Sequence, residues 1–328
     1  MTILSYNIFH SCYGAGVAAA LLARRRIAGG REAREVDVQQ LKTIGVVGPG
    51  MMGSEIALVF ALAGHPTIIS DQNRSAAEAA LERLRGVLER GAGRGFWTKD
   101  AAAGALANLR VVGGLDDYSD RDLVIEAVFE SEAVKREVFT RLDKIMAAQA
   151  GVASNTSSIP ITSLAAGLSE ERRKRFVGTH FFSPVSRMQL VEVIPGLDTD
   201  LGYVDAVTET LRGIGKIPIR VKDVAGFAIN RLLHALVLES IRLVEEGVCT
   251  PADIDLGCKL GLGHPIGPFE LLDNTTNTLS SDVHEVLYKA YGERFLPRPL
   301  LRQMVAAGYD GRKAGRGWYR YGKDGKRL

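Results

Sequence analysis

The sequence predicts an α/β protein, with a Rossmann-like doubly wound sheet domain followed by an all-helical C-terminal domain. Two observations lead to this fold class. Over residues 41–222, short apolar strands alternate with helices, a pattern typical of a largely parallel sheet covered by helices. Beyond residue 222 the strand pattern stops, and helical periodicity continues until a short strand-like tail at 318–321. We therefore place a sheet domain at 41–222 and a helical domain at 223–328.

The individual elements follow from local patterns along the chain. Strands are expected where short apolar runs are bounded by turn residues, at 41–48, 67–70, 110–112, 123–128, 152–154, 176–182, 189–194 and 217–221. Helices are expected between them, at 51–64, 74–90, 98–107, 132–148 and 203–212. In the C-terminal domain, a long helix at 227–246 should end at Gly247, and the next should begin after the N-cap Thr250. Further helices are expected at 268–272, 282–290 and 299–307.

Composition and charge exclude several classes of protein. The 328 residues are 46% hydrophobic and 24% charged, which is typical of a folded domain rather than a disordered or membrane protein. A formal net charge of +3 is too small to indicate a nucleic-acid partner. Three widely spaced cysteines indicate neither disulfides nor a metal site, and the histidines lack metal-ligand spacing. We expect a protein of the reducing cytoplasm, without bound metal or membrane span.

Residues 1–40 do not fit the fold. The apolar run at 14–23 precedes the basic run at 24–26, which is the reverse of the order in a secretory signal. The apolar run is also too short to span a bilayer. A transit peptide is one alternative, because Glu32 is the first acidic residue. We expect a poorly ordered N-terminal extension that takes no part in the fold.

A glycine motif joins the first strand to the first helix. It reads GPGMMG at 48–53, which is the G-x-G-x-x-G pattern in a strand–turn–helix context. Gly48 permits the tight turn, Gly50 lets a pyrophosphate approach the backbone, and Gly53 allows the helix to pack closely on the strand. Met51 and Met52 open the helix whose N-terminal amides would face the phosphates. A tight turn without a ligand is the alternative.

An acidic residue follows at the end of the second strand. Asp71 lies 23 residues after Gly48, where a carboxylate would accept a hydrogen bond from the adenosine ribose. The same carboxylate disfavours the 2′-phosphate of NADP. Arg74 is a mild counter-signal, which we interpret as the solvated first turn of its helix. The glycine motif and the acid together predict NAD as the cofactor.

The run FVGTHFFSPVSRMQLVEVIP at 176–195 contains the candidate catalytic base. His180 lies at the exit of the first of its two strands, and Glu192 lies inside the second. A carboxylate in so apolar a strand is costly unless it is paired. A histidine oriented by a glutamate is a general base with a fixed tautomer. A buried structural pair is the alternative, and this run alone does not decide between the two.

Further polar residues are expected at the carboxyl edge of the sheet, where ligands of such folds bind. Glu126 and Glu130 flank a strand exit and Lys135 follows on the helix, but charges at a helix start are commonly just solvated. Residues 154–158, SNTSS, form either a plain turn or hydroxyls beside the nicotinamide, which we favour. Asn230 has poor propensity for the first turn of an apolar helix, which points toward a substrate cleft.

Taken together, these motifs resemble the L-3-hydroxyacyl-CoA (3-hydroxybutyryl-CoA) dehydrogenase family. The resemblance runs from about residue 41 to 321 and is carried by IGVVGPGMMGSEIA, IEAVFESEAVKREVF, SNTSSIPIT, GTHFFSPVSRMQLVEVI, KDVAGFAINRLL, GHPIGPFELLD and GRKAGRGWYRY. It implies NAD-dependent, reversible oxidation of a (3S)-3-hydroxyacyl-CoA thioester to the 3-ketoacyl-CoA, in fatty-acid β-oxidation or short-chain acyl-CoA metabolism. It also implies a homodimer formed through the helical domain.

The resemblance implies catalytic roles for individual residues. His180 matches the catalytic base, and Glu192 matches the carboxylate that orients it. Ser157 matches a hydroxyl that contacts the substrate and the nicotinamide. Asn230 matches an amide that helps to hold the reacting oxygen.

Cofactor and coenzyme A contacts are implied in the same way. Asp71, Glu130 and Lys135 match contacts to NAD. Lys313, in GRKAGRGWY, matches a position associated with the CoA moiety. Ser183 stands at a cofactor-side position where many members have asparagine; it can still donate a hydrogen bond, with a shorter reach.

Two other departures concern the substrate. Val87 stands where a CoA-contacting serine is expected, which leaves the placement of CoA there to Arg90 or Arg94. The segment LLDNTTNT at 271–278 replaces a more apolar, glycine-containing segment, which puts the acyl-chain preference in doubt.

Two alternative functions stand beside this one. A related NAD-dependent dehydrogenase of a non-CoA hydroxy acid, such as a sugar acid or carnitine, would share the cofactor motif. Comparing rates for the free acid and the thioester separates these two enzymes. A catalytically silent, crystallin-like NAD-binding protein is disfavoured because both His180 and Glu192 are present.

Overall fold

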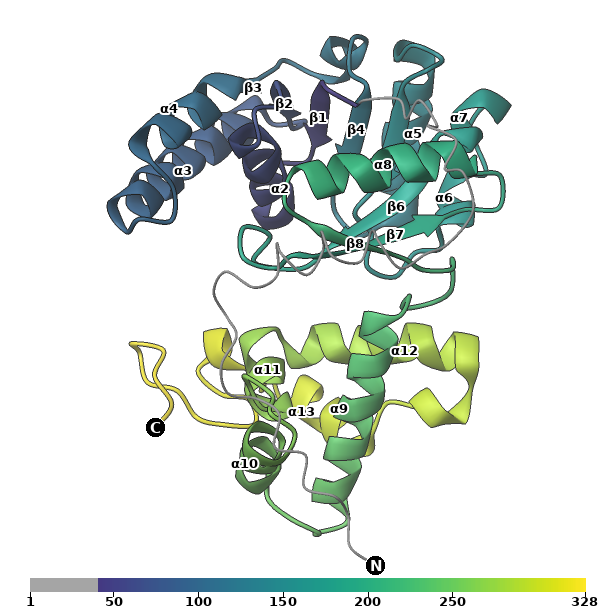
Figure 1. Ribbon diagram of the computed structural model, residues 1–328. Helices are drawn as coiled ribbons and strands as arrows, with labels where there is room; N and C mark the ends of the chain where they lie inside the picture. Colours follow the sequence, from purple (N-terminus) through teal and green to yellow (C-terminus); the bar gives the residue numbers. More distant parts are fainter. Residues whose placement is uncertain (1–40) are drawn as a thin grey trace, which may run out of the picture. The chain divides into compact units, whose positions relative to one another are not determined.

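The computed structural model describes residues 41–328, and the extension expected at 1–40 lies outside the described residues. Eight strands form a sheet in the order β3-β2-β1-β4-β5-β6-β7-β8 (Figure 1). They are β1 Ile44–Val47, β2 Thr67–Ser70, β3 Leu109–Val111, β4 Leu123–Glu126, β5 Gly151–Ser154, β6 Phe176–Phe181, β7 Leu190–Pro195 and β8 Ile217–Arg220. The predicted fold class, a doubly wound α/β sheet followed by helices, is confirmed.

The strand order reverses between β1 and β4. β1 pairs in parallel with both β2 and β4, and the chain runs outward from this pair in both directions. β7 is the exception, because it returns antiparallel to β6 before β8 pairs in parallel with β7. In such sheets ligands bind in the crevice at the carboxyl ends of the strands, beside the reversal point. The segments that follow β1, β2, β4 and β5 all start from this edge.

Helices cover both faces of the sheet (Figure 1). They are α2 Met51–Leu62, α3 Arg74–Gly93, α4 Lys99–Asn108, α5 Glu132–Ile145, α6 Ile161–Ala165, α7 Glu170–Lys174 and α8 Leu201–Gly213, with the 3₁₀ turn η2 at Leu115–Tyr118. The short helices α6 and α7 were not predicted. Each has five residues, which is too short to show a helical period in the sequence.

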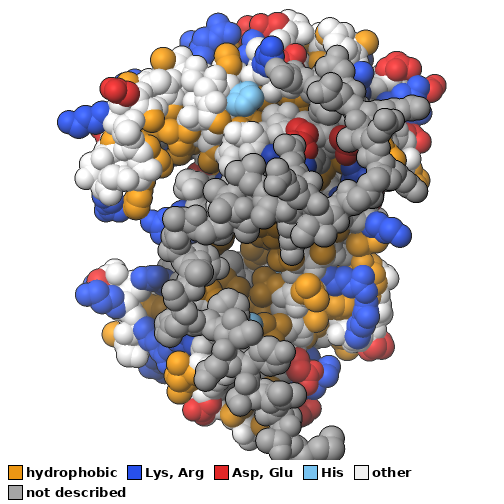
Figure 2. Space-filling view, in the orientation of Figure 1, with side chains coloured by type: hydrophobic (Ala, Val, Ile, Leu, Met, Phe, Trp, Pro, Cys, Tyr) orange, Lys and Arg blue, Asp and Glu red, His pale blue; other side chains and the backbone are white. Residues whose placement is uncertain are grey.

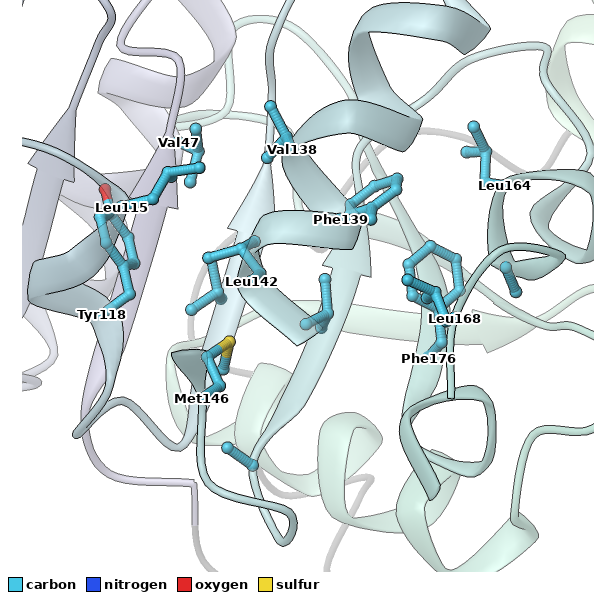
Figure 3. Packing of buried hydrophobic residues seen from close by; sticks show 14 of the residues in the cluster. Val47, Leu115, Tyr118, Val138, Phe139, Leu142, Met146, Leu164, Leu168 and Phe176 are labelled. Carbon is cyan, nitrogen blue, oxygen red and sulfur yellow. The ribbon is translucent and has the colours of Figure 1, made fainter. Parts of the chain in front are cut away.

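The packing of α5 on the sheet supports the strand ends that carry the candidate site. Val138, Phe139 and Leu142 of α5 lie over the strands in a common apolar cluster (Figure 3). The ring of Phe139 meets the ring of Phe176 on β6 edge to face, with centroids 4.8 Å apart. Aromatic pairs of this geometry contribute about 0.5–1.5 kcal/mol beyond their buried area.

The second part of the chain is helical, as predicted. Its helices are α9 Ile229–Glu245, α10 Pro251–Gly261, α11 Pro268–Asn274, α12 Asn277–Tyr291 and α13 Pro299–Ala306, with 3₁₀ turns η3 at Glu293–Phe295 and η4 at Arg312–Ala314. The predicted caps are present: Gly247 follows α9 with φ +71°, and the Thr250 hydroxyl accepts a hydrogen bond from the Asp253 amide. Within residues 41–328, no helix is both long and apolar enough to cross a membrane.

The strand expected at 318–321 was wrong. The C-terminal segment forms only isolated bridges, and a buried carboxylate takes the amides that a strand would have paired. Asp273 accepts hydrogen bonds from the amides of Trp318 and Tyr319, each at 2.9 Å, and from the Tyr321 hydroxyl. The alternation that suggested a strand therefore belongs to an irregular segment tied to α11.

Two buried histidines pack between α9 and α12. Nδ1 of His234 lies 3.1 Å from Nε2 of His284, and both side chains are buried. Burial, together with the charge that His284 would carry, lowers the pKa of His234 to about 3. Burial lowers the pKa of His284 to about 4. Both imidazoles are therefore neutral in the folded protein at neutral pH.

This pair makes the protein sensitive to acid. The unfolded state takes up protons near pH 6.5 while the folded state does not, so stability is fully present above pH 6.5 and falls as the pH drops toward 4. At pH 5 the loss is about 2 kcal/mol per histidine. Urea unfolding at pH 7 and pH 5 should show a smaller pH dependence in the His234→Leu/His284→Leu variant. A pH dependence equal to that of the half-buried control His264→Gln would contradict this.

Candidate active site

The glycine turn between β1 and α2 has the shape that a dinucleotide requires. Gly48 has φ +88°, and a Cβ there would lie 2.9 Å from the backbone of Ala127. A Cβ on Gly53 would lie 2.1 Å from the Gly48 carbonyl oxygen, so this position needs glycine for packing. A Cβ on Gly50 would meet nothing within 4 Å, so packing of the chain does not require glycine there. The open side at Gly50 fits the approach of a pyrophosphate to the start of α2.

A cavity of about 490 Å³ lies at the carboxyl ends of β1 and β2. Gly48, Asp71, Gly114 and Phe129 are among the residues that line it. One oxygen of Asp71 accepts the Asn73 amide at 2.9 Å, and the half-buried side chain remains at the cavity wall. These residues fit the adenosine half of NAD.

The counter-signal for NADP is absent from this cavity. Arg74 is paired with Glu78 at 2.9 Å on the exposed side of α3, as the interpretation of a solvated helix start predicted. Arg74 is also not among the residues that line the cavity. Met51 and Met52 lie in the first turn of α2, and Met51 is 70% exposed.

His180 and Glu192 face each other across the antiparallel pair β6–β7. They are register partners, and His180 Nδ1 lies 2.7 Å from Glu192 Oε2. Glu192 is fully buried and His180 is 5% exposed. A carboxylate only accepts hydrogen bonds, so the proton of the neutral imidazole lies on Nδ1 and Nε2 keeps its lone pair. This imidazole has the geometry of a general base.

Glu192 has a second contact that the sequence did not indicate. Its Oε1 accepts the amides of Ala228 at 2.9 Å and Ile229 at 3.1 Å, at the start of α9. Phe227, just before them, has φ +43° and places its ring 5.8 Å from that of His180. The same carboxylate therefore orients the imidazole and binds the N-terminus of the helix that carries Asn230.

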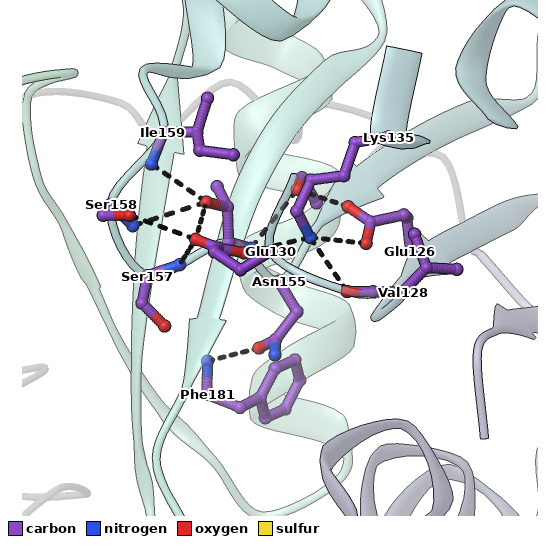
Figure 4. Close-up of polar contacts among 11 residues, drawn as sticks. Glu126, Val128, Glu130, Lys135, Asn155, Ser157, Ser158, Ile159 and Phe181 are labelled. Atoms are coloured by element: carbon purple, nitrogen blue, oxygen red, sulfur yellow. Dashed lines mark hydrogen bonds and ion pairs between the residues drawn. The ribbon is translucent and has the colours of Figure 1, made fainter. Parts of the chain in front are cut away.

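The loop after β5 is organised by Glu130. Its Oε1 accepts hydrogen bonds from the Thr156 hydroxyl at 2.6 Å, the Ser157 amide at 3.0 Å and the Ser158 hydroxyl at 3.2 Å (Figure 4). Burial alone would raise the pKa of Glu130, but the Lys135 ammonium and these donors hold it below its usual value. In Figure 4 the Ser157 hydroxyl points away from Glu130, which leaves it available to a ligand.

Asn230 reaches the same loop from the helical part of the chain. Its amide nitrogen donates to the Ser157 carbonyl oxygen at 3.4 Å. Asn155, on the other side, accepts the Phe181 amide at 3.0 Å through its side chain. The structure thus brings together Ser157, Asn230 and the strand of His180, as the sequence predicted.

The interpretation of Glu126 as a solvated charge was wrong. Glu126 is fully buried at the end of β4, where Oε1 lies 2.6 Å from Lys135 Nζ and Oε2 accepts the Ser154 hydroxyl at 2.7 Å. Burial raises the pKa of Glu126, and the neighbouring ammonium opposes this shift. Lys135 is also buried, at 1% exposure, although the helix-start position suggested a surface charge.

Two predicted residues lie outside these contacts. Lys313 is exposed in η4 and makes no hydrogen bond or ion pair to the part of the chain that the structure describes. Ser183 is exposed at the start of the loop that joins β6 to β7. Neither is linked to His180 or Ser157 by a direct polar contact in residues 41–328.

The sequence did not indicate the groups that hold this β6–β7 loop. The buried Lys216 donates to the carbonyl oxygens of Val185 and Met188, the latter at 2.9 Å. Glu55, on α2, accepts the Ser186 amide at 3.2 Å. The acceptors of Lys216 are backbone carbonyls, which leave no signal in the sequence.

The fold and the glycine turn define the class of protein, which is an NAD-dependent oxidoreductase. Residues 43–224 match the family model of the 3-hydroxyacyl-CoA dehydrogenase NAD binding domain, and residues 226–321 match that of the 3-hydroxyacyl-CoA dehydrogenase C-terminal domain. The chain belongs to the 3-hydroxyacyl-CoA dehydrogenase family, and its cofactor is NAD.

Similar proteins agree with this assignment. A probable 3-hydroxybutyryl-CoA dehydrogenase of Deinococcus radiodurans is 41% identical over 282 residues, which cover 84% of this chain and 99% of the relative. That of Bacillus subtilis is also 41% identical, over 86% of this chain and 98% of the relative. The crystal structure of (S)-3-hydroxybutyryl-CoA dehydrogenase from Ralstonia eutropha is 40% identical with a TM-score of 0.84, covering 87% of this chain and all of that one.

Proposed function

We propose that the protein catalyses reversible oxidation of a short-chain (3S)-3-hydroxyacyl-CoA to the 3-ketoacyl-CoA, in fatty-acid or short-chain acyl-CoA metabolism. The observation that carries the proposal is the buried contact between Glu192 and His180 Nδ1, which leaves Nε2 as a proton acceptor. The names of the relatives, 3-hydroxybutyryl-CoA dehydrogenases, supply the substrate class.

The chain's own residues account for the proton and the geometry of this reaction. Bound NAD supplies the hydride acceptor. Nε2 of His180 removes the hydroxyl proton, and Glu192 stabilises the imidazolium that forms. The Ser157 hydroxyl and the Asn230 amide hold the reacting oxygen, so orientation contributes as well as proton transfer. In the reverse direction His180 returns the proton.

A basic cavity near the site favours a phosphorylated carrier over a free acid. The cavity has a volume of about 400 Å³, and Arg90, Arg94 and Arg187 are among its lining residues. None of the three guanidinium groups forms an ion pair with a carboxylate in residues 41–328. The exposed ring of Phe96 and the indole of Trp97 offer aromatic faces beside them. Phosphates bind guanidinium groups, and a purine stacks on such faces, so this cavity fits the nucleotide part of coenzyme A.

We expect Arg94→Gln to raise KM for acetoacetyl-CoA about tenfold and to leave kcat nearly unchanged, because a charge-assisted hydrogen bond distant from the reacting carbon is lost. KM for the acetoacetyl thioester of pantetheine, which lacks the nucleotide, should not change. The measurement is NADH oxidation followed by absorbance with both thioesters and with free acetoacetate. Arg85→Gln, which breaks an exposed pair with Glu82 on the same helix, is the matched control.

A non-CoA hydroxy acid remains the second candidate, because one solved relative has such a title. It is a diketoreductase described as acting on dicarbonyl compounds, 29% identical with a TM-score of 0.75, covering 86% of this chain and all of that one. Turnover of a free hydroxy acid with kcat/KM equal to that of the CoA thioester would favour this candidate.

We also propose that the protein is a cytoplasmic homodimer that associates through its helical domain, at 223–328. Large hydrophobic side chains are exposed there, among them Leu232, Val248, Leu256, Leu260 and Leu262. In Figure 2, hydrophobic side chains reach the surface among Lys and Arg side chains in the lower part of the view. The two cysteines of this domain, Cys249 and Cys258, are free thiols, as a reducing compartment allows.

A further inference from the structure

The ammonium group of Lys135 is enclosed by protein acceptors. Nζ lies 2.6 Å from Glu126 Oε1, 3.1 Å from Glu130 Oε2 and 3.2 Å from the Val128 carbonyl oxygen. A lysine ammonium has three N–H donors, so these three acceptors use all of them. With 1% of the side chain exposed, Lys135 has neither a free donor nor a free surface for a cofactor.

The geometry points to a positioning role: Lys135 and Glu126 form a buried ion pair that holds Ser157 in place through Glu130, and Lys135 does not contact NAD. This differs from the cofactor contact that the family resemblance implied for Lys135. The inference rests on the proposed function, in which Ser157 holds the reacting oxygen. Glu126 gains a role that neither the sequence motifs nor the resemblance assigned.

Two connections lead from the ion pair to the Ser157 loop. The first runs through Glu130, whose Oε2 lies on Lys135 while its Oε1 accepts the Ser157 amide at 3.0 Å. The second runs through Ser154, whose hydroxyl donates to Glu126 Oε2 and accepts the Thr156 amide at 3.2 Å. Glu126 and Lys135 thus support the loop at both of its sides (Figure 4).

The charge of Lys135 is needed for the first connection. Glu126 and Glu130 lie on the same ammonium, and without it their negative charges would face each other at close range. Glu130 is 39% exposed and can turn toward solvent, whereas Glu126 is fully buried and cannot. Loss of the ammonium therefore releases Glu130 and, with it, the Ser157 amide and the Thr156 hydroxyl.

The test is a double-mutant cycle between Lys135 and Ser157. Lys135→Met keeps the aliphatic length and removes the charge, and it should lower kcat for acetoacetyl-CoA reduction by roughly 10–100-fold, as expected for a misplaced substrate contact. In the Ser157→Ala background the same change should lower kcat by less than about twofold. The dissociation constant of NADH, measured by fluorescence titration, should stay within about threefold of the wild-type value in Lys135→Met.

Each contrary outcome overturns the inference. A purely structural role for Lys135 predicts the same loss of kcat in both backgrounds, and a cofactor contact predicts a large rise in the NADH dissociation constant. Glu126→Gln/Lys135→Met, which removes both buried charges, gives a second reading if the single variant folds poorly. Glu132→Gln, at the exposed start of α5, is the control and should leave all constants unchanged. If the wild-type protein does not reduce acetoacetyl-CoA, the proposed function fails, while the NADH titration still tests the cofactor contact.

Discussion

Replacing His180 by alanine is expected to lower kcat for acetoacetyl-CoA reduction by roughly two to four orders of magnitude, the range typical of a lost general acid–base group. The reason lies in the protonation of the ring. Glu192 Oε2 accepts from Nδ1 at 2.7 Å, so the opposite nitrogen is the one that can exchange a proton with the substrate oxygen.

The measurement is single-turnover oxidation of NADH by excess enzyme, which separates chemistry from product release. The dissociation constant of NADH should be nearly unchanged, because the glycine turn and Asp71 lie on other strands. Added imidazole should restore part of the rate by entering the space between Phe182 and Phe227, whose rings lie 4.5 Å and 5.8 Å from that of His180. Turnover of His180→Ala within tenfold of wild type would rule out His180 as the base.

The features that the sequence predicted best are those that depend on neighbours along the chain. The glycine turn is local, because its three glycines and the flanking strand and helix lie within about fifteen residues. The His180–Glu192 contact was also predictable, since the two residues lie on adjacent strands of a hairpin with a single turn between them. Its register places them opposite each other, and the apolar context of Glu192 already called for a partner.

The features that could not be predicted depend on where a long side chain points. Glu126 and Lys135 are nine residues apart, and the same spacing fits either two solvated charges or a buried pair. Only the packing of α5 on the sheet turns the lysine inward. The second contact of Glu192, to the amides of Ala228 and Ile229, likewise depends on the turn at Phe227.

One departure from the family pattern finds a structural explanation. In LLDNTTNT the polar residues serve the fold of the helical part: Thr276 caps α12, and the buried Asn277 binds the Trp318 indole and the Tyr309 carbonyl oxygen. Their polarity therefore follows from helix capping and from the docking of the C-terminal segment. From sequence alone these uses could not be told apart from a polar lining of the acyl site.

Glu192→Gln is expected to lower kcat by roughly two to four orders of magnitude, although it removes a single charge and changes no volume. Both oxygens of Glu192 accept hydrogen bonds, one from His180 and the other from the first amides of α9. Glutamine has one oxygen. If this oxygen serves the amides, its NH₂ group faces Nδ1 and selects the tautomer with the proton on Nε2, which cannot act as a base.

The opposite orientation is no better, because the NH₂ group then faces the amides of Ala228 and Ile229, and buried donors are left without acceptors. That arrangement costs about 1–3 kcal/mol, so the variant should lose stability as well as activity. Urea unfolding and kcat measured on the same preparation test both effects together. The control is Glu245→Gln, which weakens the contacts of Glu245 to Arg298 and the Leu300 amide and should lower stability without lowering kcat. A Glu192→Gln enzyme that is destabilised but retains wild-type kcat would show that Glu192 supports α9 alone, and that the imidazole of His180 needs no carboxylate.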